Sequence, residues 1–216
     1  MNRHAQDAAA RFDNWATTYG DDRLSSWFRF FQAFAISRLD FSSGCGFLDV
    51  GCATGWAVRE AAKQITCGKA CGIDISQKMI DRAIAQAHML TNADFQVANA
   101  EFIPYPEESF TSVLCTCSFH HYPNPLKALC EIKRVMKKDG TLVILESARD
   151  LSFAIWLQDL WRKHFERSHV RYYTRQELQA LVEQANLRLA KEILTIKRLL
   201  FKKKLFTGLM LLECVK

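Results

Sequence analysis

The residues of this chain that are best suited to chemistry begin with a turn of small residues at positions 47–56, FLDVGCATGW. An apolar run leads through Asp49 into glycines at Gly51 and Gly55, which is typical of a buried strand whose carboxyl end opens at a ligand. Glycine lets the backbone approach a ligand that a β-carbon would push away. A dinucleotide-binding turn needs glycine-like residues at its first, third and sixth positions. The sixth residue here is Trp56, so the pattern disfavours a nicotinamide or flavin cofactor.

A second acidic residue, Asp74, lies near the end of the apolar run at positions 70–75, ACGIDI. At the carboxyl end of the second strand of an open α/β sheet, an acid accepts hydrogen bonds from ribose hydroxyls. The two oxygens of the carboxylate can bind both vicinal hydroxyls. Helix capping is the alternative role, but Ser76 already offers an N-cap. We therefore expect Asp74 to contact a ribose.

Two adjacent histidines, His120 and His121, follow the apolar segment at positions 109–117. Imidazole titrates near neutral pH, so either side chain is a candidate general base. His120 is preferred because it lies nearer the end of the expected strand. The alternative is that both residues only line a ligand pocket. No metal site is expected, because no third ligand has a matching spacing.

Alternating strands and helices are predicted to position these residues. Strands are expected at 47–50, 70–75, 93–97, 109–117 and 141–145, and helices at 56–64, 76–90, 126–136 and 175–184. This order predicts a parallel sheet with crossover helices. Lys137 to Gly140 should end the third helix, and Thr174 with Glu177 should form a capping box at the fourth.

The last residues are predicted to form two antiparallel strands, 187–196 and 208–215. The loop between them contains Lys202, Lys203 and Lys204. This lysine run is most simply the exposed turn of a terminal hairpin, and a phosphate or lipid contact is the alternative.

Aromatic residues recur at helical spacing in the amino-terminal region. Helices are expected at about 5–19 and 23–39, with Phe12, Trp15 and Tyr19 on one face of the first and Trp27, Phe31 and Phe34 on one face of the second. Such stripes usually belong to the core.

The positive charge is concentrated in the last third of the chain. Residues 1–150 carry 16 Lys and Arg against 17 Asp and Glu, whereas residues 151–216 carry 13 against 6, so the net charges are −1 and +7. Such a basic region attracts an anionic substrate, nucleic acid or lipid head groups, or is simply a solvated surface.

A helix expected at 151–165 combines an apolar face with a basic end. Phe153, Trp156 and Trp161 are among its apolar residues, and Arg162 to His164 follow, with Arg167 beyond. Three interpretations remain open: packing against the amino-terminal helices, a wall of a substrate pocket, and a helix lying on a membrane surface.

Composition indicates one globular domain, with 49% hydrophobic and 24% charged residues. The amino terminus lacks the apolar core of a signal peptide, and no run approaches the roughly 18 apolar residues of a membrane span. The eight cysteines never form a Cys-x-x-Cys pair. We expect reduced core cysteines in a cytoplasmic protein.

The order of these motifs resembles class I S-adenosylmethionine-dependent methyltransferases of the ubiquinone/menaquinone-biosynthesis-like (methyltransferase type 11) group. The resemblance covers about residues 12–146 and is close in EIKRVMKKDGTLVILE at 131–146. Three positions depart from the family pattern: Ala53 replaces the middle glycine, Asn99 replaces the acid that meets adenine, and Thr111 replaces an aspartate.

The resemblance implies a fold, a cofactor and its contacts. The fold is α/β, a Rossmann-like seven-stranded mostly parallel sheet with helices on both faces and an antiparallel C-terminal hairpin. The cofactor is S-adenosylmethionine, and the product is S-adenosylhomocysteine. The small-residue turn approaches methionine, Asp74 binds ribose, positions 99–101 surround adenine, and positions 118–121 line the transfer site. The implied cofactor contacts are Tyr19, Asp49, Gly51, Cys52, Ala53, Gly55, Asp74, Ile75, Asn99, Ala100, Glu101, Cys117 and Ser118, with His120 and His121 as catalytic candidates.

The resemblance also implies how the single domain is divided. Residues 1–40 form a helical lid, 41–146 the cofactor-binding core, 147–173 a substrate-shaping insertion, and 174–216 the last helix and terminal hairpin. Tyr19 is assigned to the lid because Phe12, Asp13, Ala16 and Tyr19 match the family's Phe-Asp-x-x-Ala-x-x-Tyr segment.

The function expected from sequence is methyl transfer to a small molecule that is anionic and has an apolar or aromatic body. The alternatives are a methyltransferase acting on RNA or protein, and a non-catalytic cofactor-binding or scaffold protein. A nucleic-acid partner is not expected, because the chain has no appended RNA-binding module and no Asn-Pro-Pro-Tyr-like motif. A weak contact with a membrane surface stays open. The sequence assigns neither the acceptor atom nor the oligomeric state.

Overall fold

The computed structural model describes residues 3–19, 23–41, 46–197, 199–201, 204–206 and 208–216. Its α-helices are α1 (Arg3–Trp15), α2 (Arg23–Ile36), α3 (Trp56–Gln64), α4 (Gln77–Gln86), α5 (Pro125–Val135), α6 (Phe153–Phe165) and α7 (Arg175–Gln184). Its strands are β1 (Phe47–Val50), β2 (Ala70–Asp74), β3 (Ala93–Val97), β4 (Phe110–Thr116), β5 (Met136–Ser147), β6 (Arg188–Leu189), β7 (Leu194–Ile196), β8 (Leu199–Phe201), β9 (Lys204–Phe206) and β10 (Leu209–Val215).

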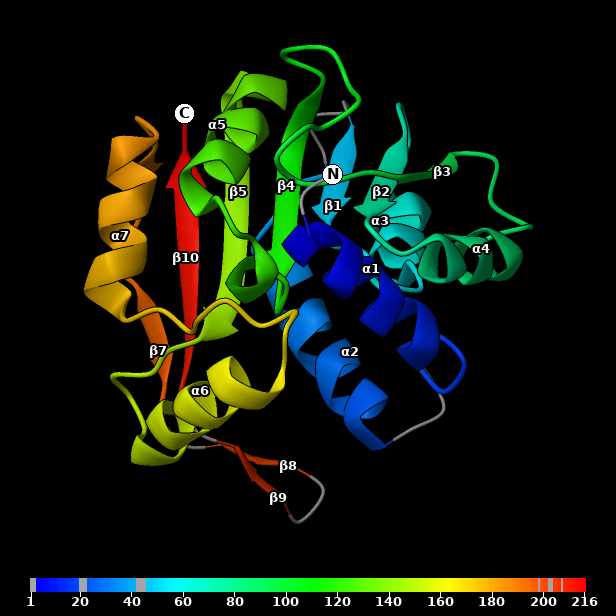
Figure 1. The fold of residues 1–216 in the computed structure, drawn as a ribbon. Coiled ribbons are helices and arrows are strands. Elements are labelled where there is room, and N and C mark those ends of the chain that lie inside the picture. Colours follow the sequence, from blue (N-terminus) through cyan, green and yellow to red (C-terminus); the bar gives the residue numbers. More distant parts are fainter. Residues whose placement is uncertain (1–2, 20–22, 42–45, 198, 202–203, 207) are drawn as a thin grey trace.

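The main sheet has the strand order β3-β2-β1-β4-β5-β10-β6, and β7 pairs with β10 next to β6. The five strands from β3 to β5 are parallel, and β10 runs antiparallel to β5, β6 and β7. Successive strands are added on one side of β1 as far as β3 and then on its other side from β4, so the carboxyl ends of the parallel neighbours β1 and β4 open at a switch point. The predicted α/β fold with antiparallel C-terminal strands is confirmed (Figure 1).

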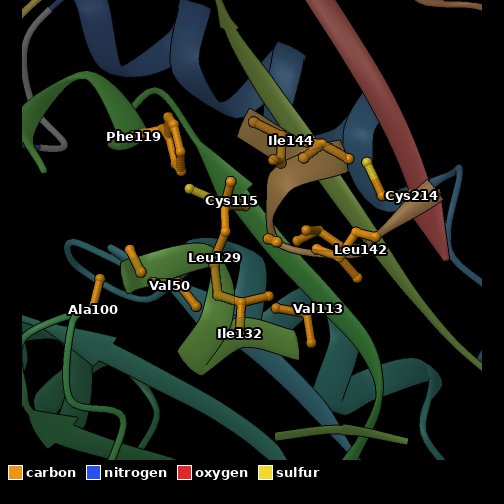
Figure 2. Packing of buried hydrophobic residues seen from close by; sticks show 14 of the residues in the cluster. Val50, Ala100, Val113, Cys115, Phe119, Leu129, Ile132, Leu142, Ile144 and Cys214 are labelled. Carbon is orange, nitrogen blue, oxygen red and sulfur yellow. The ribbon is translucent and has the colours of Figure 1, made fainter. Parts of the chain in front are cut away.

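Helices cover both faces of the sheet and enclose two hydrophobic clusters. α5 and α7 pack on one face, where Leu48 and Val50 of β1 meet Leu129 and Ile132 (Figure 2). α2, α3 and α4 pack on the other face, where Phe47 points. The alternation along β1 follows from the period-two geometry of a strand. Because both faces are buried, the strands are nearly continuous apolar runs.

Helix starts follow the capping chemistry expected from the sequence. Ser76 Oγ accepts a hydrogen bond from Met79 N at 3.1 Å at the start of α4. Thr174 and Glu177 form the predicted capping box of α7. These bonds satisfy backbone amides that have no partner inside the helix.

The C-terminal connection differs from the expected single hairpin. The edge strand is split into β6 and β7, and Ala190 N between them donates to Glu213 O of β10. A separate two-stranded sheet, β8–β9, stands where a loop was predicted. Lys204 begins β9, whereas Lys202 and Lys203, on which the turn prediction rested, lie outside the described residues.

The predicted turn at Lys137 to Gly140 is wrong, because β5 already begins at Met136. Met136 pairs with Phe110 of β4, and a register shift between Phe110 and Ser112 accommodates the extra residues. Extra residues in one strand of a pair form a bulge-like irregularity of this kind. In the described part of the chain, no helix has the length and apolar character needed to cross a membrane.

Candidate active site

A cavity lies at the carboxyl ends of β1, β2 and β4, where α1 and α2 cover the sheet edge (Figure 1). Its empty volume, including the part that opens to solvent, is about 880 Å³. Its wall includes these sequence-predicted site residues: Tyr19, Gly51, Ala53, Asp74, Ile75, Asn99, Ala100, Cys117, Ser118 and His121. The cavity thus gathers residues from separate motifs between positions 19 and 121.

The small-residue turn is held in a conformation that favours glycine. Gly51 and Gly55 have φ of +82° and +72°, and Ala53 between them has φ of +47°. A β-carbon at Gly51 would lie 2.5 Å from the Cβ and Oγ atoms of Ser118. Glycine is therefore required at Gly51 for both backbone conformation and space. Ala53 occupies a left-handed conformation that costs an L-residue free energy.

Asp74 ties the turn to the end of β2. Its Oδ2 accepts from Ala53 N and its Oδ1 accepts from Ser76 N, each at 2.9 Å. Burial raises the pKa of Asp74 to about 6, while the backbone amides of Ser76 and Ala53 act in the opposite direction. Each carboxylate oxygen keeps a further lone pair for a ligand hydroxyl. The carboxylate therefore organises the turn and lines the cavity at once.

Three predicted contacts lie beneath the turn and outside the cavity wall. Cys52 is buried against Gly72 of β2, and Gly55 begins α3 and packs on Phe95. Asp49 is fully buried, and neither carboxylate oxygen has a hydrogen-bond partner within the described structure. Burial, with a smaller contribution from the charge of Asp74, raises the pKa of Asp49 to about 8. A buried carboxylate without a partner is costly, so Asp49 suits a site that receives a positive charge.

The segment at positions 99–101 is shaped by its own side chains. Asn99 Oδ1 accepts from Glu101 N at 2.9 Å, and Glu101 Oε1 accepts from Asn124 N at 2.9 Å. Glu101 is buried and lies outside the cavity wall, so it connects the segment to the start of α5. Asn99 and Ala100 line the cavity.

The two histidines have different surroundings. His121 lines the cavity, and its Nδ1 lies 2.6 Å from the carbonyl oxygen of Ser168. His120 lies outside the cavity wall, and its Nδ1 lies 2.9 Å from Glu146 Oε2. Glu146 also accepts from Phe119 N at 2.7 Å. Of the two catalytic candidates, His121 therefore reaches the cavity, whereas His120 contacts Glu146 outside its wall.

The Ser168 contact fixes the tautomer of neutral His121. A carbonyl oxygen only accepts, so Nδ1 carries the proton and Nε2 is the basic nitrogen. Burial lowers the pKa of His121 well below its usual value of 6.5, and a charge on His120 would lower it further. His121 is thus held as a neutral imidazole. Burial also lowers the pKa of His120 and raises that of Glu146 to about 8.

The aromatic stripe of α1 faces the cavity, whereas that of α2 packs mainly in the core. Phe12 meets the His121 ring edge-on at 5.0 Å between centroids, and Trp15 meets Tyr19 edge-on at 4.9 Å. Phe31 of α2 is buried in the core. The core interpretation of both stripes is therefore right for α2 and wrong for α1.

Several wall residues were missed by sequence reasoning. These are Ala5, Ala8, Phe28, Gln32, Val50, Ile73, Met79, Ala98, Thr116, Tyr122 and Pro123, in addition to the stripe residues Phe12 and Trp15. Tyr122 had a usable signal, because it follows the two histidines directly. Its hydroxyl lies 3.0 Å from Ser118 Oγ and donates to Val50 O at 3.3 Å. Phe28 and Gln32 could not be identified from the sequence. Their helix carries similar residues on its other sides, and the sequence does not show which side faces the cavity.

Side chains near the carboxyl end of α1 fasten it over the cavity on two sides. Asp13 Oδ1 accepts from Ser76 Oγ at 2.5 Å and from Lys78 N at 3.1 Å, and Arg82 donates to Ala16 O. Arg11 donates to Ser168 Oγ at 2.9 Å and forms an ion pair with Glu166. α1 is thus bonded to α4 on one side and to the segment after α6 on the other.

Comparison with known proteins agrees with this arrangement. A family model described as a methyltransferase domain matches residues 7–192. Demethylmenaquinone methyltransferase of Tropheryma whipplei (strain Twist) is 29% identical over 156 residues, which cover 70% of this chain and 63% of that protein. The chain spans less than two thirds of the length of the first curated relatives it matches.

Solved structures share the fold at low identity. A chain of the complex between the Haloferax volcanii Trm112 methyltransferase activator and a methyltransferase has a TM-score of 0.79 at 20% identity, covering 94% of this chain and 96% of that one. Geranyl diphosphate C-methyltransferase of Streptomyces coelicolor A3(2), in complex with S-adenosyl-L-homocysteine among other ligands, has a TM-score of 0.76 at 14% identity, covering 99% and 98%. Since the family model covers most of the sequence, the chain belongs to the methyltransferase domain family, within the class I S-adenosylmethionine-dependent methyltransferases of the ubiquinone/menaquinone-biosynthesis-like group.

Proposed function

We propose that this protein transfers the methyl group of S-adenosylmethionine to a small molecule held in the cavity. The observation that supports the proposal is that one cavity contains a glycine turn, a carboxylate placed to bind ribose, and a histidine whose tautomer is fixed by a hydrogen bond. Gly51, Asp74 and His121 come from three separate strand ends and share this wall.

The residues present fit the cofactor of the family. The absence of a β-carbon at Gly51 leaves room for the Ser118 side chain, and the Gly51 backbone lines the cavity. Asp74 keeps lone pairs for two ribose hydroxyls, and Asn99 and Ala100 would flank adenine. Asp49, buried and without a partner in the described structure, would offset the charge of the methionine ammonium group.

When bound, S-adenosylmethionine supplies an electrophilic methyl group on its sulfonium. His121 would accept at Nε2 the proton of an oxygen or protonated-amine acceptor, because Nδ1 is committed to Ser168 O. Phe12 and Trp15 would exclude water and position the acceptor for in-line attack, which supplies much of the rate. A neutral amine or a carbon nucleophile with no proton to lose before attack would need positioning alone.

The acceptor we favour is anionic with an apolar or aromatic body. The aromatic residues of α1 and Phe28 of α2 give the cavity wall its apolar character. The basic last third of the chain supports an anionic substrate. The Tropheryma relative is named for demethylmenaquinone, which supports a small-molecule acceptor.

We also propose that residues 1–40 act as a lid, 41–146 as the cofactor-binding core, 147–173 as the insertion that shapes the acceptor side, and 174–216 as the closing helix and strands. The bonds of Asp13 and Arg11 to other segments support the lid assignment.

A cytoplasmic location is supported by the free thiols of the described cysteines, which suit a reducing compartment.

Calorimetric titration with S-adenosylmethionine and S-adenosylhomocysteine tests the proposal. We expect binding of both, with dissociation constants of roughly 1 μM to 1 mM. Asp74→Asn should weaken binding at least about tenfold, since a hydrogen bond to a charged group contributes about 1.5–3 kcal/mol. The exposed Asp139→Asn serves as the matched control, and thermal melting reports whether each variant folds.

No detectable binding at millimolar ligand would reject the enzyme assignment. Normal binding by a folded Asp74→Asn would reject the ribose contact. After binding is established, methyl-labelled S-adenosylmethionine incubated with fractions of a small-metabolite pool should label one chemical class. Labelling of RNA or protein fractions instead would exclude a small-molecule acceptor.

A further inference from the structure

Helix α6 is amphipathic, but its apolar side faces solvent. Its large exposed side chains are Phe153, Trp156, Leu157, Leu160, Trp161 and Phe165, which are between 43% and 72% accessible. The only buried residue of the helix is the charged Asp159. A helix that covers a protein core presents the opposite pattern, with apolar residues inward and charged residues outward.

Buried hydrogen bonds hold α6 in this orientation. Asp159 Oδ1 accepts from Tyr172 N at 2.5 Å and lies 2.8 Å from His169 Nε2. Its Oδ2 forms an ion pair with Lys163 at 2.7 Å. Rotating the helix so that its apolar side faced inward would break these bonds and expose the buried Asp159 carboxylate to solvent. The exposure of the aromatic side is therefore a property of the fold.

The exposed side chains form a continuous surface. Phe153 stacks on Trp156 at 5.4 Å between ring centroids, and Trp161 lies 5.3 Å from Phe165. A contiguous exposed apolar surface of this kind is typical of a site of interaction. We refer to the six exposed residues named above as the α6 face.

Basic residues border the α6 face at its carboxyl end. Lys163, His164 and Arg167 are exposed there, and Arg162 beside them contacts the Tyr172 ring. The last third of the chain carries the whole net positive charge of the protein. The carboxyl end of the α6 face thus favours an anionic partner.

We propose that the α6 face docks on the surface of an anionic phospholipid bilayer. Trp and Phe side chains prefer the headgroup region, and helices with an aromatic apolar side and basic residues lie in the plane of that interface. The basic border is complementary to the negative potential of such a membrane. A second copy of the chain lacks this complementarity, because it would bring the same positive charge to the interface.

Docking would bring the bilayer next to the segment that supports His121. Asp159 of α6 bonds His169, whose ring lies 5.4 Å from that of His120 and 6.2 Å from that of His121. The same segment provides Ser168, whose carbonyl binds His121. The proposal does not depend on the proposed function, since the α6 face is separate from the cavity wall.

Vesicle sedimentation tests the proposal. The full chain should sediment with vesicles of equal parts phosphatidylglycerol and phosphatidylcholine, and less with pure phosphatidylcholine, and added salt should reduce binding. The double variant Trp156→Ser/Trp161→Ser should bind the anionic vesicles about tenfold more weakly. Met89→Ser, which removes an apolar side chain that is 81% exposed elsewhere, should bind as the wild type does.

The proposal is overturned if the wild type sediments with neither vesicle, or if the double variant binds as tightly as the wild type. It is also overturned if sedimentation equilibrium finds a dimer that the double variant dissociates, because the α6 face would then join two copies. Thermal melting checks that each variant folds. Calorimetry with S-adenosylmethionine is run in parallel, so a failure of cofactor binding would count against the proposed function alone.

Discussion

The two sides of the cavity are built in different ways. On the side of β1, β2 and β3, short contacts between neighbouring strand ends hold the wall, such as Asp74 with Ala53 N and Ser76 N. On the opposite side, segments far apart in the chain meet through side chains, as Arg11 does with Ser168 and Phe12 with His121. Residues of the first side belong to short sequence motifs that can be recognised locally. The second side depends on contacts between segments that are far apart in the chain.

This difference predicts where substitutions act. Changes on the strand side should alter cofactor binding and stability together, because the same bonds serve both. Changes on the opposite side should alter turnover while leaving cofactor binding nearly intact.

The largest effect is expected for His121→Gln. With an acceptor from the labelling screen that must lose a proton, turnover should fall about 10²–10⁴-fold, the usual contribution of a general base. The dissociation constant of S-adenosylmethionine should change little, because His121 belongs to the acceptor side. Rapid-quench kinetics and calorimetry measure the two quantities, with the exposed His88→Gln as the matched control.

The same base predicts the acid limb of the pH profile. Burial lowers the pKa of His121, so the basic form persists below 6.5. In the wild type, kcat/KM should rise with pH, with a midpoint below 6.5, and then level off. Persistence of this limb in His121→Gln would assign it to another group, and equal losses of turnover and cofactor affinity would make His121 a pocket wall only.

Gly51→Ala should have the next largest effect and should act on the strand side. The new β-carbon would lie 2.5 Å from Ser118 at a φ of +82°, so both cofactor affinity and stability should fall. The backbone strain alone costs about 1–2 kcal/mol. Gly68→Ala, at an exposed position with φ of +102°, controls for strain. Denaturant unfolding should show a larger loss for Gly51→Ala, and an equal loss would exclude the close approach as its cause.

Asp49→Asn should weaken cofactor binding and make the unfolding free energy less dependent on pH. Burial raises the pKa of Asp49 to about 8, so the folded state binds more protons than the unfolded state between pH 4 and 8. Wild-type stability should therefore decline across this window as pH rises, and the variant should decline less. S-adenosylmethionine affinity should fall roughly tenfold if the carboxylate offsets the ligand ammonium. Melting curves at several pH values and calorimetry test this, and unchanged affinity would assign Asp49 to structure alone.

The smallest effect is expected for Ala53→Gly. Relief of the left-handed alanine should exceed the added chain entropy and raise the unfolding free energy by about 0.5–1 kcal/mol. Ala85→Gly, in an exposed turn of α4, should lower it by about 1 kcal/mol. A loss of stability in Ala53→Gly measured by urea unfolding would show that the turn gains nothing from glycine at this position.

The sequence predicts the elements that local patterns determine and misses those that depend on distant contacts. The bounds of β1, α3, β3 and α7 and the cap at Ser76 agree with the structure, because local periodicity and capping chemistry specify them. The start of β5 was missed because its pairing with Phe110 depends on a distant strand. Likewise, nothing local marks where the last edge strand breaks into β6 and β7.

The site residues show the same limit. Gly51 and Asp74 were found from their motifs, and both line the cavity. The different surroundings of the two histidines could not be predicted from the sequence, because their partners Glu146 and Ser168 come from distant segments. The orientation of α6 was hidden for a similar reason, since Asp159 is buried only by its bonds to the segment around His169.

The fastening of α1 on two sides has a consequence for how two ligands bind. Asp13 bonds α1 to the start of α4 on the strand side, and Arg11 bonds it to Glu166 and Ser168 on the other. A ligand that binds more tightly when α1 is closed favours the closed position for its neighbour too. Thermodynamic linkage makes that gain reciprocal and equal in both directions. Donor and acceptor would thus tighten each other's binding through one helix, without touching the same side chain.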